Sequence, residues 1–310
     1  VEKSIQILDK NNYIYHKDGA VWFKSTHYKD DKDRVVKRES GETTYFASDI
    51  AYHLNKFQRG YDKILNIWGA DHHGYLPRVK AAISALKENS QKFEVIFIQF
   101  ASLIRKGKKV SMSTRGGEFI TLNQLMKEVT PEAARFFFIN RKGHQHLNFD
   151  LDLTKEQSKD NPLYYIQYGH ARICSVFNKL AEENRAYKEK VGLENLILLD
   201  SLKETEILQL LTEFPNIIER AAKNYEPHLV CYYLRELAAA FHSYYNSEKV
   251  LGDCNTKLFR SKKGPLFRAI AARRRNDLTH NGPSLVILVA LRFEKSDWEI
   301  LHHLDIGHRS

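Results

Sequence analysis

The sequence predicts an open α/β sheet followed by an all-α second domain. Residues 64–68 and 95–100 are short apolar runs, and a segment with helical apolar spacing separates them. A strand–helix–strand crossover of this length places its two strands in parallel within an open sheet. From Pro162 the apolar spacing becomes helical, which predicts a bundle of helices.

The first part of the chain also carries shorter β-type patterns. Residues 21–23 and 43–46 are β-prone, and residues 39–42 form a turn signal between them. Within the crossover, Pro77 suits the first turn of a helix. One face of that helix carries four apolar residues, Leu76, Val79, Ile83 and Leu86.

Three apolar stripes define the predicted bundle. They are Ile173, Val176, Phe177 and Leu180; Ile207, Leu211, Phe214, Ile218 and Ala221; and Leu234, Leu237, Phe241 and Tyr244. Composition changes after Asp152, so the predicted domains are residues 1–155 and 156–260. Residues 261–310 are basic and sustain no helical stripe, which indicates a disordered or foreign tail.

Composition limits the classes of function. The net charge of +10 favours a polyanionic partner, although a basic protein with no nucleic-acid role also fits. Cys174, Cys231 and Cys254 form no CxxC pair, so a disulfide framework or zinc site is not expected and a reducing compartment fits best. The chain's first residues lack the apolar core of a signal peptide, and no apolar run is long enough to span a membrane.

The segment WGADHHGY follows the first predicted parallel strand and opens the next helix. Ligands of open α/β sheets bind at the carboxyl ends of strands, and a helix N-terminus there suits phosphate. Gly69 and Gly74 let backbone approach a ligand, and His72 and His73 can donate hydrogen bonds to it. A purely structural turn stays open, as does a metal site that adds Asp71, although adjacent residues rarely chelate one ion together.

The segment YFASDIAYH contains a phenol and a carboxylate four residues apart, Tyr45 and Asp49. If Ser48 caps a helix, Asp49 lies in the first turn. A carboxylate beside an aromatic ring suits a guanidinium, because the carboxylate accepts a bidentate pair and the ring packs on the plane. Helix capping for stability alone is the alternative.

Two further segments carry chemistry. GKKVSMSTRGG, residues 107–117, is a basic, hydroxyl-rich loop. Its cations could stabilise a phosphoryl transition state, and a solvated loop without such a role is the alternative. NPLYYIQYGHAR places Tyr165, Tyr168 and Arg172 on one helical face. Aromatic rings interleaved with arginine form a stacking platform for unpaired bases, and core tyrosines are the alternative.

These four segments occur in this order in arginyl-tRNA synthetases, and the chain resembles that family from about Tyr15 to Lys257. Four segments resemble hallmarks of the family's catalytic domain: DGA at 18–20, DKDRV at 31–35, DIAYH at 49–53 and GADHHGY at 69–75. SMSTR at 111–115 resembles the KMSKS loop of class I. FDLD and the Tyr-rich helix start resemble the junction to the anticodon-binding domain, and YEPH and FHSYYN resemble its later helices.

The resemblance implies a partial class I catalytic domain of the Rossmann-like, nucleotide-binding α/β type, followed by an anticodon-binding helical bundle. It implies an arginine–tRNA ligase, in which arginine attacks the α-phosphate of Mg·ATP and the arginyl group then passes to the terminal adenosine of tRNA(Arg). ATP with Mg²⁺ is a substrate, and no tightly bound cofactor or protein-held metal is implied. The expected protein is a cytoplasmic monomer that binds tRNA before it activates arginine.

The resemblance also implies roles for particular residues. Lys109, Ser111, Met112, Ser113 and Arg115 would form the catalytic loop; Tyr45, Asp49 and Asp71 would bind arginine; Gly69, His72, His73 and Lys108 would border ATP; and Tyr165, Tyr168, Arg172 and Tyr244 would face tRNA.

The sequence departs from the family pattern in three ways. The HIGH motif is expected upstream of residue 1, both lysines of KMSKS are replaced, at Ser111 and Thr114, and the C-terminal tail lacks the expected amphipathic helices. The isolated chain is therefore expected to be inactive in charging. Two other hypotheses are a non-catalytic tRNA-binding module and a metal hydrolase built on Asp71, His72 and His73.

Overall fold

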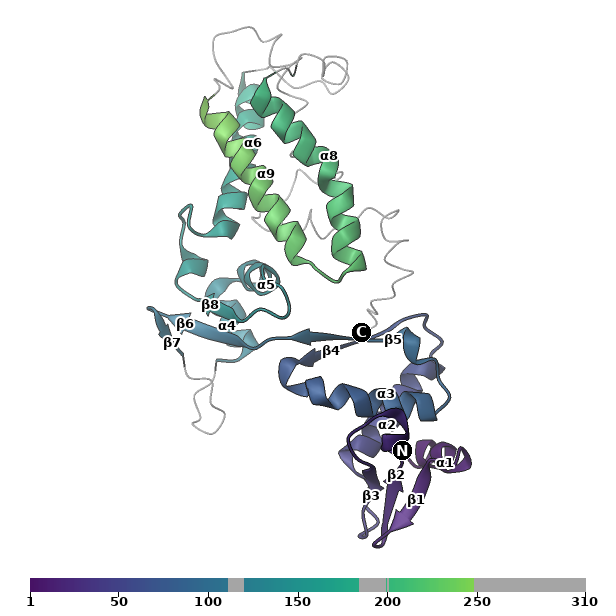
Figure 1. Ribbon diagram of the computed structural model, residues 1–310. Helices are drawn as coiled ribbons and strands as arrows, with labels where there is room; N and C mark the ends of the chain where they lie inside the picture. Colours follow the sequence, from purple (N-terminus) through teal and green to yellow (C-terminus); the bar gives the residue numbers. More distant parts are fainter. Residues whose placement is uncertain (111–119, 184–198, 200, 248–310) are drawn as a thin grey trace. The chain divides into compact units, whose positions relative to one another are not determined.

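The computed structural model describes residues 1–110, 120–183, 199 and 201–247, drawn in colour in Figure 1. The chain forms two compact units, and each is described by itself. The first is Val1–Phe100 with Gly143–Gln145, and the second begins with Ala101–Lys142 and continues from His146. The predicted boundary near residue 155 concerns the family's domains and stays a prediction. The tail predicted for residues 261–310 lies outside the described residues.

The first unit opens with a helix and a three-stranded antiparallel sheet. Helix α1 is Glu2–Lys10, and the sheet has the order β1-β2-β3, with strands Ile14–Lys17, Ala20–Phe23 and Arg34–Lys37. Asp18 and Gly19 both have positive φ, 51° and 71°, between paired Lys17 and Ala20. This is the two-residue Asp-Gly hairpin turn that matches the twist of the strands. A 3-10 helix, Ser25–Tyr28, precedes β3.

Helix α2, Tyr45–Gln58, corrects two expectations. The β-prone residues 43–46 contribute only an isolated bridge between Lys37 and Thr43 before the helix begins. The N-cap is Thr44, whose hydroxyl accepts a hydrogen bond from the Ala47 amide at 3.3 Å, so Ser48 lies inside the helix. Burial of a helical stripe decides the outcome over local propensity. The stripe is Phe46, Ala47, Ile50 and Leu54.

The predicted crossover is confirmed. Strands β4, Ile64–Gly69, and β5, Phe93–Ile98, pair in parallel from Ile64↔Phe93 to Gly69↔Ile98. A 3-10 turn, Ala70–Tyr75, leads from β4 into helix α3, Leu76–Ala85, and the 3-10 helix Ser90–Lys92 precedes β5. The α3 face predicted from spacing packs inward, with Val79 and Ile83 buried beside Ile64 and Phe93. This arrangement positions the end of β4 and the start of α3 for a ligand.

The second unit combines a small sheet with two short helices. The sheet has the order β7-β6-β8, with strands Lys108–Lys109, Ala101–Arg105 and Leu147–Asp150. Helices α4, Leu122–Val129, and α5, Pro131–Ile139, share a core with it, and the 3-10 helix Leu153–Lys155 follows β8. The most deeply buried members of that core are Phe136, Phe149 and Leu151.

Three longer helices follow in the described part of the second unit: α6, Pro162–Glu182, α8, Leu202–Lys223, and α9, His228–Ser247. In Figure 1, α6 and α9 rise in the same direction and α8 runs opposite to them. Most residues of the predicted apolar stripes share one core, whereas Ile218 and Ala221 pack with Val230 in a smaller cluster. The fully buried members of the shared core include Ile207, Phe241 and Tyr244. The prediction of a helical bundle is therefore confirmed.

Candidate functional site

The first unit contains a cavity of about 660 Å³ at the turn between β4 and α3. Its lining residues are Lys29, Asp30, Asp31, Asp71, His72, Gly74, Tyr75, Pro77 and Arg78. The segment WGADHHGY thus places polar side chains beyond the carboxyl end of a parallel strand, as the sequence predicted. Of the predicted site residues, the structure brings Asp71 and His72 to this cavity.

Asp30, which lines the cavity, belongs to a buried ion pair with Arg34 that was not predicted from the sequence. The guanidinium of Arg34 donates to both oxygens of Asp30, Nε to Oδ2 at 2.8 Å and Nη2 to Oδ1 at 2.9 Å, and it also contacts Asp31. Burial raises the pKa of Asp30, but the hydrogen bonds from Arg34 outweigh it and hold that pKa well below its usual range. The i,i+4 spacing of Asp30 and Arg34 was the available signal.

Tyr75 connects the cavity to helix α2. Burial, and then a hydrogen bond to the Asp49 carboxylate, raise the pKa of Tyr75, so its phenol stays neutral and donates to Asp49. The guanidinium of Arg78 lies 4.9 Å from the ring centre, and its Nε is buried with no hydrogen-bond partner among the described residues. Asp49 was predicted to bind the arginine substrate. It is not among the residues that line the cavity, but it is hydrogen-bonded to Tyr75, which is. Tyr45, at the start of α2, is 93% exposed and does not line the cavity.

The glycine and histidines of WGADHHGY have distinct surroundings. A Cβ added at Gly69 would lie 2.6 Å from Oδ1 of Asp71, so the close contact at Gly69 is with this carboxylate, and close approach to a ligand stays a prediction. His72 lies 3.7 Å from the Asp71 carboxylate, with both side chains more than half exposed. The ring of His73 instead stacks on Phe97, with ring centres 3.6 Å apart. His73 therefore does not line the cavity with His72.

A metal site at the same place is the alternative that the sequence left open. Within residues 1–110, 120–183, 199 and 201–247, no group of three or more His, Cys, Asp or Glu is arranged to hold a metal ion. Asp71 and His72 lie together, but His73 points to Phe97. The arrangement of these three residues therefore gives the metal-hydrolase hypothesis no support.

Behind the site, a buried hydrogen-bonded chain ties α2 to β4. The Asn66 amide donates to Nε2 of His53 at 2.9 Å and its oxygen accepts from Lys56 at 2.5 Å. Nδ1 of His53 donates to the carbonyl of Asp49 at 2.8 Å, which fixes the ring as a neutral tautomer. Burial lowers the pKa of His53 and reinforces this state. These hydrogen bonds hold in place the turn of α2 that carries Asp49.

The predicted catalytic loop is described only at its start. Lys108 and Lys109 form the exposed strand β7, joined to β6 by a turn in which Lys106 and Gly107 have positive φ, 48° and 70°. Ser111, Met112, Ser113 and Arg115 lie outside the described residues. The lysines belong to the second compact unit and the cavity to the first, and each unit is described by itself.

On the face of α6 that was predicted to bind tRNA, Arg172 is surrounded by aromatic and polar side chains. The guanidinium of Arg172 lies 4.5 Å from the ring centre of Tyr168 and 4.8 Å from that of Tyr245. Its Nη1 lies 3.1 Å from both Nδ1 of His242 and Oδ1 of Asn246. Tyr245, His242 and Asn246 come from α9, and none of them was predicted from the sequence to belong to the site. Their i+3 and i+4 spacing on one helix was the available signal.

The other predicted tRNA residues differ in exposure. Tyr168 is 43% exposed, whereas Tyr165 is half-buried and packs partly against the core of the second unit. Tyr244 is fully buried, and its hydroxyl donates to the buried carboxylate of Glu204 at 2.9 Å. A fully buried phenol has no surface to offer RNA, so the structure assigns Tyr244 to the core.

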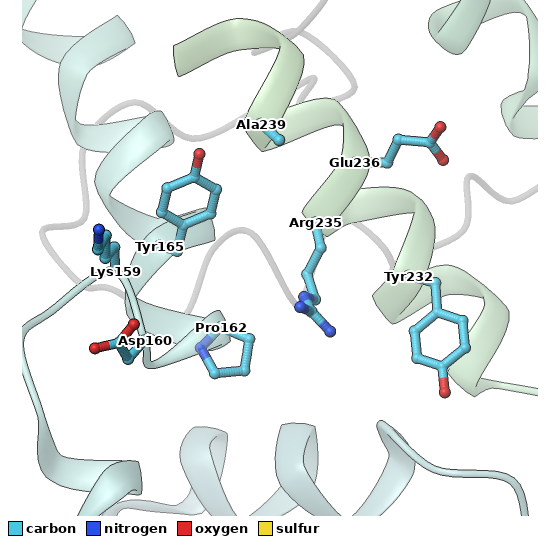
Figure 2. A pocket seen from close by; sticks show the side chains of 8 residues that line it. All are labelled: Lys159, Asp160, Pro162, Tyr165, Tyr232, Arg235, Glu236 and Ala239. Carbon is cyan, nitrogen blue, oxygen red and sulfur yellow. The ribbon is translucent and has the colours of Figure 1, made fainter. Parts of the chain in front are cut away.

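A second cavity, of about 350 Å³, lies beside this cluster between the start of α6 and the middle of α9. Figure 2 shows the Tyr165 side chain on α6 and the Arg235 side chain on α9, both of which line this cavity. Its lining residues are Lys159, Asp160, Pro162, Tyr165, Tyr232, Arg235, Glu236 and Ala239. Two cations and two carboxylates balance, so this cavity extends the aromatic surface without favouring an anion.

Comparisons with known proteins find two family domains in this chain, and the first of them includes part of the second compact unit. The family model "tRNA synthetases class I (R), catalytic domain" matches residues 1–152, and the "DALR anticodon binding domain" matches residues 166–271. The arginine–tRNA ligase of Nitrosospira multiformis is 53% identical over 251 residues, which are 81% of this chain and 42% of that protein. That of Nitrosomonas eutropha is 56% identical over the same length and coverage. The chain thus spans less than half the length of these relatives.

Solved structures give the same result. An arginyl-tRNA synthetase structure from Campylobacter jejuni matches with a TM-score of 0.77 and 35% identity, covering 87% of this chain and 57% of that one. The Thermus thermophilus arginyl-tRNA synthetase matches with a TM-score of 0.65 at 16% identity, which shows the shared fold alone.

An α/β region with polar residues beyond a parallel strand, followed by a helical domain of the DALR type, defines a class I aminoacyl-tRNA synthetase. Within that class, the relatives and solved structures described above are all arginine enzymes. The chain belongs to the arginyl-tRNA synthetase family. Across the part of the chain that the structure describes, no helix is both long and apolar enough to span a membrane.

Proposed function

We propose that this chain is part of an arginine–tRNA ligase and contributes arginine recognition, part of the ATP site and the tRNA-binding helices. The observation that carries the proposal is its 53% identity to an arginine–tRNA ligase over 251 residues, spanning both units. In the proposed reaction, a carboxylate oxygen of arginine attacks the α-phosphate of magnesium-bound ATP and pyrophosphate leaves. A ribose hydroxyl of the terminal adenosine of tRNA(Arg) then attacks the carbonyl carbon, and AMP leaves.

Arginine recognition is assigned to the first unit. Asp49 is half-buried, accepts a hydrogen bond from Tyr75, and lies on a helix turn held by His53. A carboxylate held in this way can pair with a guanidinium with little reorganisation. Asp71 adds a second carboxylate at the cavity, whereas Asp30 is already paired with Arg34. Tyr45 is exposed one turn before Asp49 and could cover the bound side chain.

The nucleotide role is assigned to residues of both units, and the tRNA role to residues of the second unit. Gly69 and His72 border the start of α3, where a phosphate or ribose can approach backbone N–H groups. Lys108 and Lys109 are exposed cations that could neutralise the triphosphate. Tyr168 and Arg172 offer an exposed ring and a guanidinium edge to unpaired bases or phosphates of the anticodon loop.

Equilibrium dialysis of the 310-residue chain with labelled arginine tests the recognition site. We expect saturable binding that lysine does not displace. The Asp49→Asn variant should weaken it by about 10- to 100-fold, the value of a hydrogen bond to a charged group. Asp62→Asn is a matched control, because its side chain is 97% exposed in the same unit. Equal binding by wild type and Asp49→Asn would contradict the assignment.

Charging and tRNA binding on the same sample separate two candidate functions. Arginine-dependent charging of tRNA(Arg) would establish the ligase directly. A non-catalytic tRNA-binding module is the second candidate, favoured because α6 and α9 together hold Arg172 beside exposed Tyr168. Salt-sensitive binding of tRNA(Arg) without charging would support that candidate, and binding of neither arginine nor tRNA would contradict both.

A further inference from the structure

Arg172 is held in one orientation by groups on α9. Both hydrogens of its Nη1 are used, one toward Nδ1 of His242 and one toward Oδ1 of Asn246, each at 3.1 Å. The rings of Tyr168 and Tyr245 contact the guanidinium at cation–π distance. Among the described residues, Nε and Nη2 of Arg172 have no hydrogen-bond partner. This edge is therefore the part of Arg172 that remains for a ligand.

The contact between Arg172 and His242 depends on the protonation of the His242 ring. Nε2 of His242 lies 3.1 Å from the carbonyl oxygen of Tyr165, and because a carbonyl only accepts, Nε2 carries a proton. Arg172 only donates, so Nδ1 must present its lone pair. A neutral ring satisfies both partners. A protonated ring would direct an N–H at the guanidinium and repel it.

Among the described residues, the surroundings of His242 add no counter-charge that would favour protonation. Burial lowers its pKa, the Tyr165 carbonyl raises it and the charge of Arg172 lowers it, and no charged group of α5 or α8 acts on it. On α6 its other neighbours are the rings of Tyr165 and Tyr168, centred 4.5 and 5.5 Å away. On α8, Lys203 and Glu204 bond instead to Ser243 and Tyr244. The residue as a whole is only 6% exposed.

We propose that His242, with Asn246, is a positioning residue that presents the Nε and Nη2 edge of Arg172 to hydrogen-bond acceptors of bound RNA, and that it does so only while its ring is neutral. The inference rests on the proposed tRNA-binding function of α6 and deepens it. It makes RNA affinity sensitive to acid through a residue that does not touch the RNA.

Two amide substitutions separate positioning from packing. The side-chain oxygen of His242→Asn can replace Nδ1 as the acceptor for Arg172, but nothing replaces the bond to the Tyr165 carbonyl. The side-chain N–H of His242→Gln can replace Nε2 as the donor to Tyr165, but it leaves Arg172 without that acceptor. Neither amide titrates. Binding of a tRNA(Arg) transcript to the 310-residue chain by fluorescence anisotropy would be measured for each, from about pH 7.5 to 5.5.

At about pH 7.5 we expect His242→Asn to retain more affinity than His242→Gln, by about tenfold, the value of one hydrogen bond to a charged group. As the pH falls, wild type should lose affinity relative to His242→Asn. With Arg172→Ala in the background, the two amide variants should bind alike. Because other histidines titrate in every sample, the ratio to His242→Asn isolates the contribution of His242.

Two results would overturn the inference while leaving tRNA binding intact: His242→Gln binding at least as tightly as His242→Asn, or parallel pH profiles for wild type and His242→Asn. A test without a change at His242 compares wild type with Arg172→Ala, which should lack the loss in acid. If instead wild type fails to bind tRNA(Arg), or Arg172→Ala binds equally well at every pH, the proposed RNA role of Arg172 itself is wrong.

Discussion

The ion pair between Asp30 and Arg34 makes a sharp prediction about stability. Asp30→Asn removes the negative charge from a carboxyl whose side chain is 3% exposed and leaves the guanidinium of Arg34, 11% exposed, without its counter-charge. Breaking a buried pair from one side costs about 3–5 kcal/mol. Asn keeps one oxygen as an acceptor, so we expect a loss near the lower end, about 3 kcal/mol.

Asp31→Asn is the matched control for this change. Asp31 contacts the same guanidinium, but its side chain is 73% exposed, so its loss should cost less than about 1 kcal/mol. Urea unfolding followed by tryptophan fluorescence suits the comparison, because Trp22 and Trp68 both lie in the first unit. Urea also leaves the ion pair unscreened by salt.

The pH dependence of Asp30→Asn has a definite sign. The folded pKa of Asp30 is depressed, so its contribution is complete above the ordinary value of 3.8 and is lost as the pH falls below it. The stability difference between wild type and Asp30→Asn should therefore shrink below about pH 4. If the Asp30 and Asp31 variants lose equal stability at neutral pH, the pair is not the buried anchor of the cavity wall described above.

Three further predictions concern other parts of the fold. Thr44→Ala should destabilise the first unit by about 0.5–2 kcal/mol in urea unfolding, because Thr44 caps α2, and Ser48→Ala should change it little; the reverse order would place the cap at Ser48. Tyr244→Phe should lower the thermal stability of the chain by about 1–3 kcal/mol, since Glu204 loses a buried partner, without loss of tRNA affinity; weaker tRNA binding would return Tyr244 to the RNA surface. The folded pKa of His53 is lowered, so wild-type stability should fall as the pH drops through the ordinary histidine range near 6.5, and His53→Gln should flatten that slope; identical slopes would mean that His53 is not held neutral.

Periodicity predicted the parallel crossover and the helical bundle because both depend on which side chains are buried. The α3 stripe containing Val79 and Ile83, and the α9 stripe containing Leu237 and Phe241, are buried as their spacing indicates. In each case the local pattern and the global packing agree, so the sequence alone was sufficient.

Local propensity failed where tertiary contacts decided the structure. Residues 43–46 are β-prone, yet the burial of Phe46 and Ile50 and the cap at Thr44 make them the start of a helix. Tyr244 shows the opposite conflict. Its spacing placed it in a core stripe, while the family resemblance suggested a tRNA role, and its burial follows the spacing.

The site could be predicted as segments but not as an assembly. Tyr168 and Arg172 share a helical face, and that was visible in the sequence. Their partners His242 and Asn246 are about seventy residues away on another helix, so no local pattern joins them. The pairing of Asp49 with Tyr75 was hidden for the same reason, because it depends on how α2 packs beside the turn after β4.

Tyr75 belongs to the hydrophobic core and to the cavity wall at once. Its ring packs against Phe46 and Trp68, while its hydroxyl bonds to Asp49 and its face meets Arg78. A substitution there cannot change recognition of a ligand without also changing how well the unit folds. In a mutational scan this position would therefore be pleiotropic, and a selection for activity alone would count folding defects as losses of chemistry. The permissible evolutionary steps at Tyr75 are correspondingly few, because each must satisfy two requirements at once.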